Sequence, residues 1–119
     1  MKMLLCSLGL TGLAALGGSL AWGHHAYDAN YIDERGTIDG VVVEVFWGNP
    51  HVHYYLEVVG DDGSTAIWDV EASNLGVMRR SGWTEETIEV GDRIRVSGDL
   101  GREGRRRLAL DRDSLEFVD

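Results

Sequence analysis

Apolar and polar residues alternate from about residue 37, and this period of two is that of a β-strand with one buried face. The residues on the apolar face of this stretch are Val41, Val43, Val45 and Trp47. Asn49 and Pro50 then break the pattern, because proline has no N–H for a strand ladder and restricts the residue before it. We therefore predict a first strand over 37–47, preceded by a polar lead-in over 24–35.

A second and a third strand are predicted over 51–59 and 64–71, on either side of the turn sequence Asp-Asp-Gly at 61–63. The apolar residues predicted to face inward have even numbers and are Val52, Tyr54, Leu56, Val58, Ala66, Trp68 and Val70. The side chains predicted to face outward from the second strand are those of His51, His53, Tyr55 and Glu57.

The register of this hairpin follows from parity. Apolar side chains must share one face of the hairpin, so the numbers of two opposed residues must add up to an even number. A three-residue loop that ends at Gly63, with this glycine in the left-handed conformation, meets the condition. His53 then lies opposite Glu71, and Tyr55 lies opposite Asp69.

The rest of the chain predicts one short helix and two further strands. Residues 74–80 have apolar residues at helical spacing, with Ser73 or Asn74 able to cap the first turn. The fourth strand begins near 91–92, and the fifth uses the apolar residues Leu108, Leu110, Leu115 and Phe117. Three strands, a helix and two strands is the order of the OB-fold, a five-stranded Greek-key barrel. The alternative is an open sandwich of similar strands.

Residues 1–23 have the features of a secretory signal peptide. Lys2 precedes an apolar run that ends in small residues, and this run is shorter than the roughly 20 residues that span a bilayer. Cleavage is allowed before Trp22 or before His24. We expect a periplasmic or secreted product with no transmembrane segment after signal removal, in which 24–119 form a single domain.

Charge and cysteine content narrow the classes of partner. The chain has 20 acidic residues against 11 basic ones and a formal net charge of -9. A surface of this sign repels a phosphate backbone, so nucleic acid is not an expected partner. The single cysteine, Cys6, falls in the predicted leader. Residues 24–119 are numerous enough to form a core, so no cofactor is required for folding.

The four histidines predict a metal site. His51 and His53 are two apart on a strand and share a face at about 6–7 Å along it, so both can reach one ion. Asp69 and Glu71 on the neighbouring strand are alternative ligands, or they orient an imidazole through its other nitrogen. The alternative is that both histidines are solvated beside Tyr55.

The expected amino terminus adds nitrogen donors. A chain that starts at His24 offers its amine and that imidazole to one cupric ion, followed by His25. A chain that starts at Trp22 has histidine in third place, where amine, amides and imidazole form a square-planar copper or nickel site. The segment after His25 is long enough to bring His24 to His51. An unstructured lead-in that binds nothing is the alternative.

The remaining motifs say less about function than the histidines do. The aromatic residues Trp47, Trp68, Trp83 and Tyr54 are expected to pack in or against the core, whereas Tyr55 and Glu57 face a ligand or solvent. Arg102 and residues 105–107 form a basic cluster, which we interpret as a solvated turn. Enzyme motifs find little support: no phosphate loop and no nucleophile elbow occur. A metal hydrolase using His51, His53 and a carboxylate is the enzyme alternative.

Several motifs together resemble one known family. They are HHAYD at 24–28, WGNPH at 47–51, Trp68, RRSGW at 79–83 and Gly-Asp at 91–92. With them the chain resembles the secreted bacterial proteins of domain of unknown function 6152. The resemblance implies an exported one-domain protein that begins at or beside a double histidine, which favours cleavage before His24. It implies no activity.

The sequence therefore predicts a small exported binding protein. Its ligand is a transition metal, with copper favoured, held by the amino-terminal amine, His24 and His51, with His25 and His53 as further ligands. The alternative function is a non-metal interaction module of the periplasm, with an OB-fold, whose exposed second and third strands take a protein or envelope ligand.

Overall fold

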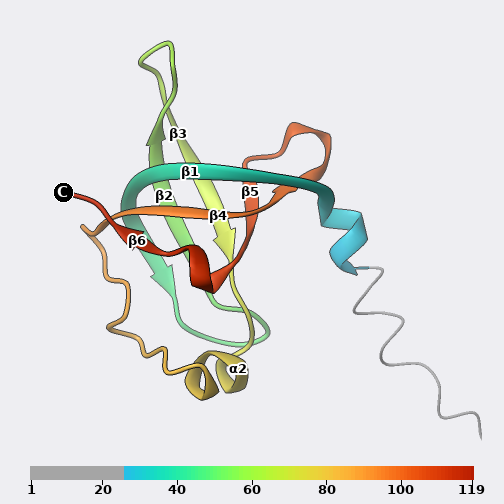
Figure 1. The fold of residues 1–119 in the computed structure, drawn as a ribbon, viewed down its shortest axis with the longest axis vertical. Helices are drawn as coiled ribbons and strands as arrows, with labels where there is room; N and C mark the ends of the chain where they lie inside the picture. Colours follow the sequence, from blue (N-terminus) through green and yellow to red (C-terminus); the bar gives the residue numbers. More distant parts are fainter. Residues whose placement is uncertain (1–25) are drawn as a thin grey trace, which may run out of the picture.

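The computed structural model describes residues 26–119, which are mostly β with two short helices (Figure 1). The helices cover 26–30 and α2 (Leu75–Arg80). The strands are β1 (Tyr31–Phe46), β2 (His53–Val59), β3 (Thr65–Glu71), β4 (Arg93–Gly101), β5 (Arg107–Leu110) and β6 (Glu116–Phe117). Two 3-10 turns, η1 (Arg102–Gly104) and η2 (Arg112–Ser114), precede β5 and β6. The predicted signal peptide lies outside the described residues.

The strands form one six-stranded mixed sheet whose pairings close into a ring. The order is β1-β2-β3-β5-β4-β6, and β1 also pairs with β4. The β3–β5 pair is parallel, whereas the other pairs are antiparallel. The predicted order of three strands, a helix and further strands is therefore present. The predicted single fifth strand is wrong, because Asp111 accepts a hydrogen bond from the amide of Asp113 and turns the chain between β5 and β6.

The first strand differs from its prediction in length and in face. It begins at Tyr31 instead of near 37 and contains a bulge between Val42 and Glu44. The extra residue changes which parity faces the core. Val42 is buried before the bulge, whereas Val45 packs against the core after it. The predicted inward positions of Val41 and Val43 are therefore wrong, since both side chains are exposed.

The β2–β3 hairpin has the predicted register. His53 pairs with Glu71, and Tyr55 pairs with Asp69. Gly63 in the connecting turn has a φ of 83°, the left-handed conformation that the three-residue loop requires. The even-numbered apolar residues of both strands face inward, so the odd-numbered histidine and carboxylates share the outer face.

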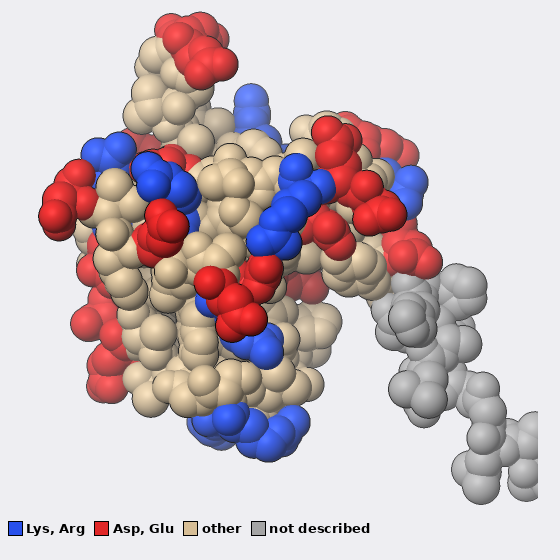
Figure 2. All heavy atoms as spheres, viewed as in Figure 1, with Lys and Arg blue, Asp and Glu red and all other residues tan. Residues whose placement is uncertain are grey.

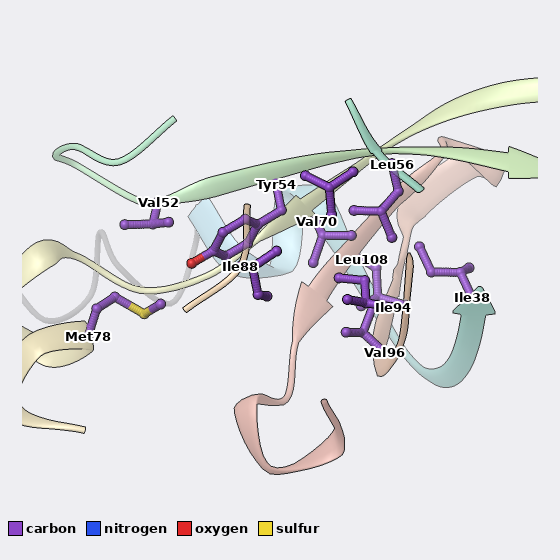
Figure 3. Close-up of a cluster of buried hydrophobic side chains, with 11 residues drawn as sticks. Ile38, Val52, Tyr54, Leu56, Val70, Met78, Ile88, Ile94, Val96 and Leu108 are labelled. Carbon is purple, nitrogen blue, oxygen red and sulfur yellow. The ribbon is translucent and has the colours of Figure 1, made fainter. Parts of the chain in front are cut away.

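The core cluster contains residues of β1 to β5 and Met78 of α2, and α2 lies below the strands in Figure 1. Asn74 caps this helix by accepting a hydrogen bond of 2.9 Å from the amide of Val77, as the sequence predicts. Figure 3 shows Tyr54 of β2 directed toward Ile88 and Met78. The fully buried side chains are Tyr54, Leu56, Met78, Ile88, Ile94, Leu108, Val42, Val52, Val70 and Val96.

The tryptophans pack against this core. Trp47, Trp68 and Trp83 contact the buried cluster, and the ring of Trp83 lies 6.3 Å from that of Tyr54. This confirms the prediction that these aromatic residues serve packing, and it leaves Tyr55 as the aromatic side chain that faces outward from β2.

Candidate functional site

The outer face of β2 and β3 brings two histidines to two carboxylates. The Nδ1 atom of His53 lies 2.7 Å from Oδ1 of Asp69, and Nδ1 of His51 lies 3.2 Å from Oε1 of Glu71. His53 reaches the carboxylate on its diagonal and not Glu71 directly opposite. His51 lies just before β2, which begins at His53 and not at the predicted residue 51. The structure therefore places His51, His53, Asp69 and Glu71 in one cluster.

The same ring nitrogen faces the carboxylate in both pairs. A neutral imidazole that donates its Nδ1–H to a carboxylate keeps a lone pair on Nε2. Carboxylates hold metal-binding histidines in this way, because the hydrogen bond selects the tautomer and orients the ring. The hydrogen bond to Asp69 leaves Nε2 of His53 as the nitrogen atom that can bind a ligand, whereas His51 is near Glu71 without a hydrogen bond to it.

The two histidines differ in exposure. The side chain of His53 is 19% exposed, and its ring stacks on Tyr55 with centroids 6.0 Å apart and planes 11° apart. On the β1 side, the ring centroid of Phe46 lies 6.3 Å from that of His53. The side chain of His51 is 49% exposed. His53 is thus held in place by its neighbours, whereas His51 is the more accessible of the two.

Arg107 holds both carboxylates from the β5 side. Its guanidinium donates a hydrogen bond of 2.7 Å to Glu71, and its Nε lies 3.7 Å from Oδ2 of Asp69. A second terminal nitrogen donates to the side chain of Asn30 at 3.1 Å. The planar guanidinium also lies over the ring of Tyr31, 5.4 Å from its centroid.

Sequence reasoning missed this role of Arg107, which it placed in a solvated basic turn. The parallel pairing of β3 with β5 sets Arg107 beside Asp69. No local pattern predicts a pairing between strands so far apart in the sequence. The available signal was parity, since Leu108 is buried and its neighbour must face outward.

Tyr31 completes the cluster, and Tyr27 lies beside it. The hydroxyl of Tyr31 donates to Oε2 of Glu71 at 3.1 Å, and that of Tyr27 donates to Asp99. Burial and the negative charge of Glu71 raise the pKa of Tyr31 above its usual value. Burial and the hydrogen bond to Asp99 do the same for the pKa of Tyr27. Both hydroxyls therefore keep their protons further into alkali than an ordinary tyrosine does.

The carboxylates are already occupied by these partners. Glu71 accepts hydrogen bonds from Tyr31 and Arg107 and faces His51, and Asp69 lies between His53 and Arg107. An orienting role fits these contacts better than direct metal binding. Within residues 26–119, no group of three or more His, Cys, Asp or Glu side chains is arranged to hold a metal ion. A complete site would need donors from elsewhere in the chain.

A pocket of about 550 Å³ opens beside this cluster. His51, Glu71, Tyr31 and Tyr27 line it together with apolar side chains of α2 and β5. Ala26, the first described residue, also lines it. The predicted ligands His24 and His25 lie outside the described residues, and His25 is the covalent neighbour of Ala26.

The predicted ligand-face residues point outward. Glu57 is exposed and pairs with Val41 on one side and Ile67 on the other. Tyr55 is partly buried, and burial together with the charge of Asp69 raises its pKa. The outer face therefore combines acidic residues with exposed apolar ones.

The predicted basic cluster does not act as one unit. Arg102 donates to the backbone carbonyls of Asp28 and Tyr31, and Arg107 belongs to the acidic cluster. Arg105 lies 3.8 Å from Glu103. Arg106 makes no ion pair with any residue in the described part of the chain.

Comparisons with known proteins add the family. No helix among residues 26–119 is both long and apolar enough to cross a membrane. Neither the search of curated proteins nor that of solved structures found a match. The model of a family of unknown function, DUF6152, matches residues 13–109. The chain, with its paired histidines and carboxylates, belongs to this family.

Proposed function

We propose that the protein binds a transition metal, with copper preferred, through the amino-terminal amine, His24 and His51, with His25 and His53 as further ligands. The observation that supports this most is the position of His51 and His53 beside two carboxylates. Each has Nδ1 near a carboxylate, and His53 forms the hydrogen bond to a carboxylate that is common for metal-binding histidines. The role is binding, delivery or sequestration of the metal.

The position of the described amino-terminal residues supports the contribution of His24 and His25. Ala26 lines the same pocket as His51, and the 26–30 helix is tied to the sheet through the hydrogen bond between Asn30 and Arg107. The residues that directly precede Ala26 therefore join the chain at this pocket.

The donor types favour copper. Amine and imidazole nitrogens suit the tetragonal geometry of Cu(II), which also stands highest among the divalent metals in general affinity. The net charge of -9 attracts cations to the molecule. Asp69 and Glu71 supply negative charge next to the imidazoles without occupying the ligand positions themselves.

For the fold we propose an OB-fold barrel with β6 added at its edge. The ring order β1-β2-β3-β5-β4, the parallel β3–β5 pair and the helix between β3 and β4 support this assignment. We further propose that residues 1–23 are a signal peptide and that the protein is periplasmic or secreted.

The test begins with the natural terminus. The full chain is expressed with its own leader and without an amino-terminal tag, and the mass of the exported product is measured. We expect a chain that begins at His24 and binds about one copper ion, as followed by titration and by spectroscopy of the Cu(II) ligand field. Undetectable binding by this product would overturn the proposal.

Variants separate the ligands from the surroundings. His51→Ala and the insertion of one residue before His24 should each weaken copper binding by roughly tenfold or more, because each removes or displaces a nitrogen donor. Tyr27→Phe is the matched control, since it keeps a ring that lines the same pocket and removes no proposed ligand. Equal loss in the control would contradict the assignment.

A non-metal interaction module is the second candidate. Exposed apolar side chains on the outer surface of β1, including Val41, Val43 and Phe46, favour it. Its ligand would be a protein or envelope component. A photoreactive residue at position 46 should then form a discrete cross-linked product in cells, and copper depletion should leave that product unchanged. A product that requires copper would contradict this candidate.

A further inference from the structure

One edge of β3 is left without a neighbouring strand. β5 pairs with β3 only at Asp69 to Glu71, which leaves Thr65 to Trp68 paired on the β2 side alone. The amide of Asp69 donates to the carbonyl of Arg106, so odd-numbered residues direct their backbone groups toward the β5 side. Thr65 and Ile67 therefore present N–H and C=O groups at the free edge.

This edge lacks the features that usually protect one. Proteins block exposed strand edges with charged side chains, proline, bulges or a covering element. The sequence Thr-Ala-Ile-Trp at 65–68 has neither charge nor proline, and its pairing with β2 is free of register shifts. Ile67 is 51% exposed. The β2–β3 hairpin also projects beyond the rest of the ring (Figure 1).

The charges at the two ends of the edge are complementary. The tip of the hairpin carries Asp61 and Asp62, and Figure 2 shows acidic atoms gathered at the end of this projection. Arg105 and Arg106, both exposed, lie where β5 begins to pair with β3. An antiparallel second β3 would bring the acidic tip of one hairpin to the arginines of the other, and symmetry makes this contact twice.

We propose that the protein forms a two-fold dimer through antiparallel pairing of β3 with β3 of a second copy. With Thr65 opposite Ile67 of the other copy, these residues exchange their free backbone groups and the axis passes through Ala66. The exposed side chain of Ile67 then lies next to Thr65 of the second copy. The histidine cluster is at the other end of the hairpin, so the dimer forms with or without metal.

The oligomeric state tests this directly. Protein recovered after expression of the full chain, with any natural processing complete, is measured by sedimentation velocity across a wide range of concentration and with metal removed. We expect a reversible dimer. Ile67→Lys should raise its dissociation constant at least roughly tenfold, because a charge on the edge opposes strand pairing. Val90→Lys is the matched control, since Val90 is 64% exposed and lies away from β3.

Charge exchange tests the proposed register. Asp61→Arg and Arg106→Glu should each weaken the dimer, whereas the double variant should restore it, because the opposite charges again face each other. Thr65→Pro provides a second edge variant that removes a donor at a position an edge strand tolerates. A chain that is monomeric throughout, a dimer unaffected by the edge variants, or a double variant no tighter than the singles would overturn the proposal.

Discussion

His53 lies opposite Glu71 in the β2–β3 ladder, yet its imidazole bonds to Asp69, the carboxylate two residues away on the same face. Nδ1 of His51, which precedes β2, lies 3.2 Å from Oε1 of Glu71. The histidines and the carboxylates are thus offset along the hairpin. This offset keeps Nδ1 of each ring near a carboxylate. It is the relationship that places two histidines, one in β2 and one just before it, beside two carboxylates.

Loss of the Asp69 carboxylate should weaken metal binding without removing a ligand. In Asp69→Asn the hydrogen bond to His53 becomes neutral and the ring is less firmly held, so we expect the copper affinity to fall by about tenfold or more. Isothermal titration of the exported chain measures it. Asp111→Asn breaks a comparable carboxylate contact, with Arg35 at 2.7 Å, away from the cluster and should leave the affinity unchanged. Equal copper affinities for the unchanged chain, Asp69→Asn and Asp111→Asn would contradict an orienting role of Asp69.

Arg107 should stabilise the fold as well as the cluster. Arg107→Met leaves Asp69 and Glu71 facing each other without a cation, so we expect the free energy of unfolding to fall by about 1–3 kcal/mol. Arg107→Lys should recover only part of this, because an ammonium cannot contact Glu71, Asp69 and Asn30 with the same planar geometry. Urea unfolding measures the stability of both variants. An Arg107→Met protein as stable as the unchanged chain would show that the contacts of Arg107 contribute little to the free energy of unfolding.

The alternation of even- and odd-numbered residues within one hairpin determines which residues lie side by side, so part of the site could be predicted from the sequence. Even-numbered apolar residues set the register of β2 and β3, so the sequence alone places His53 opposite Glu71 and puts Tyr55 beside Asp69. Which carboxylate each histidine contacts depends on side-chain conformation, and the pattern of the sequence does not determine it. The sequence named both carboxylates but not which histidine each would contact.

Two features, the bulge in β1 and the parallel β3–β5 pairing, could not be predicted from this alternation. The bulge after Val42 inserts a residue into a run of three valines, and nothing in that run marks which valine is extra. The parallel pairing of Asp69 with Arg107 joins strands separated by α2 and β4. Its formation depends on closure of the whole ring. Arg107 therefore appears in the sequence as one of several arginines in a turn.

Two buried tyrosines should respond oppositely to loss of their hydroxyls. The Tyr54 hydroxyl is buried and has no hydrogen-bond partner among the described residues, so Tyr54→Phe should keep or raise stability, within about 1 kcal/mol. Tyr31→Phe removes the hydrogen bond to Glu71 and should lower stability by about 1–2 kcal/mol. Chemical denaturation of the two variants gives the comparison. A large destabilisation by Tyr54→Phe would indicate a partner beyond these residues.

The same tyrosine predicts a loss of stability in alkali. Burial raises the pKa of Tyr54 from 10.0 to about 12, so the folded state holds this proton more tightly than the unfolded chain does. The resulting stabilisation is complete below pH 10 and is lost as the pH rises toward 12. Tyr54→Phe should flatten this part of the stability profile, as measured by thermal unfolding at each pH. An unchanged slope would assign the alkaline loss to the other tyrosines.

Gly98 should be the glycine at which substitution is most damaging. A Cβ at this position would lie 1.7 Å from the carbonyl oxygen of Ala109, so Gly98→Ala must push β4 away from β5. Gly63 has open space around the same position, and its cost arises only from its φ of 83°. We expect Gly63→Ala to lower the free energy of unfolding by about 1 kcal/mol and Gly98→Ala by several times as much.

The β4–β5 pairing also holds Arg107 against the carboxylates, so Gly98→Ala should weaken copper binding while Gly63→Ala should not. Unfolding and titration of the two variants measure both effects, and equal losses would show that β4 and β5 can separate without disturbing the histidine cluster.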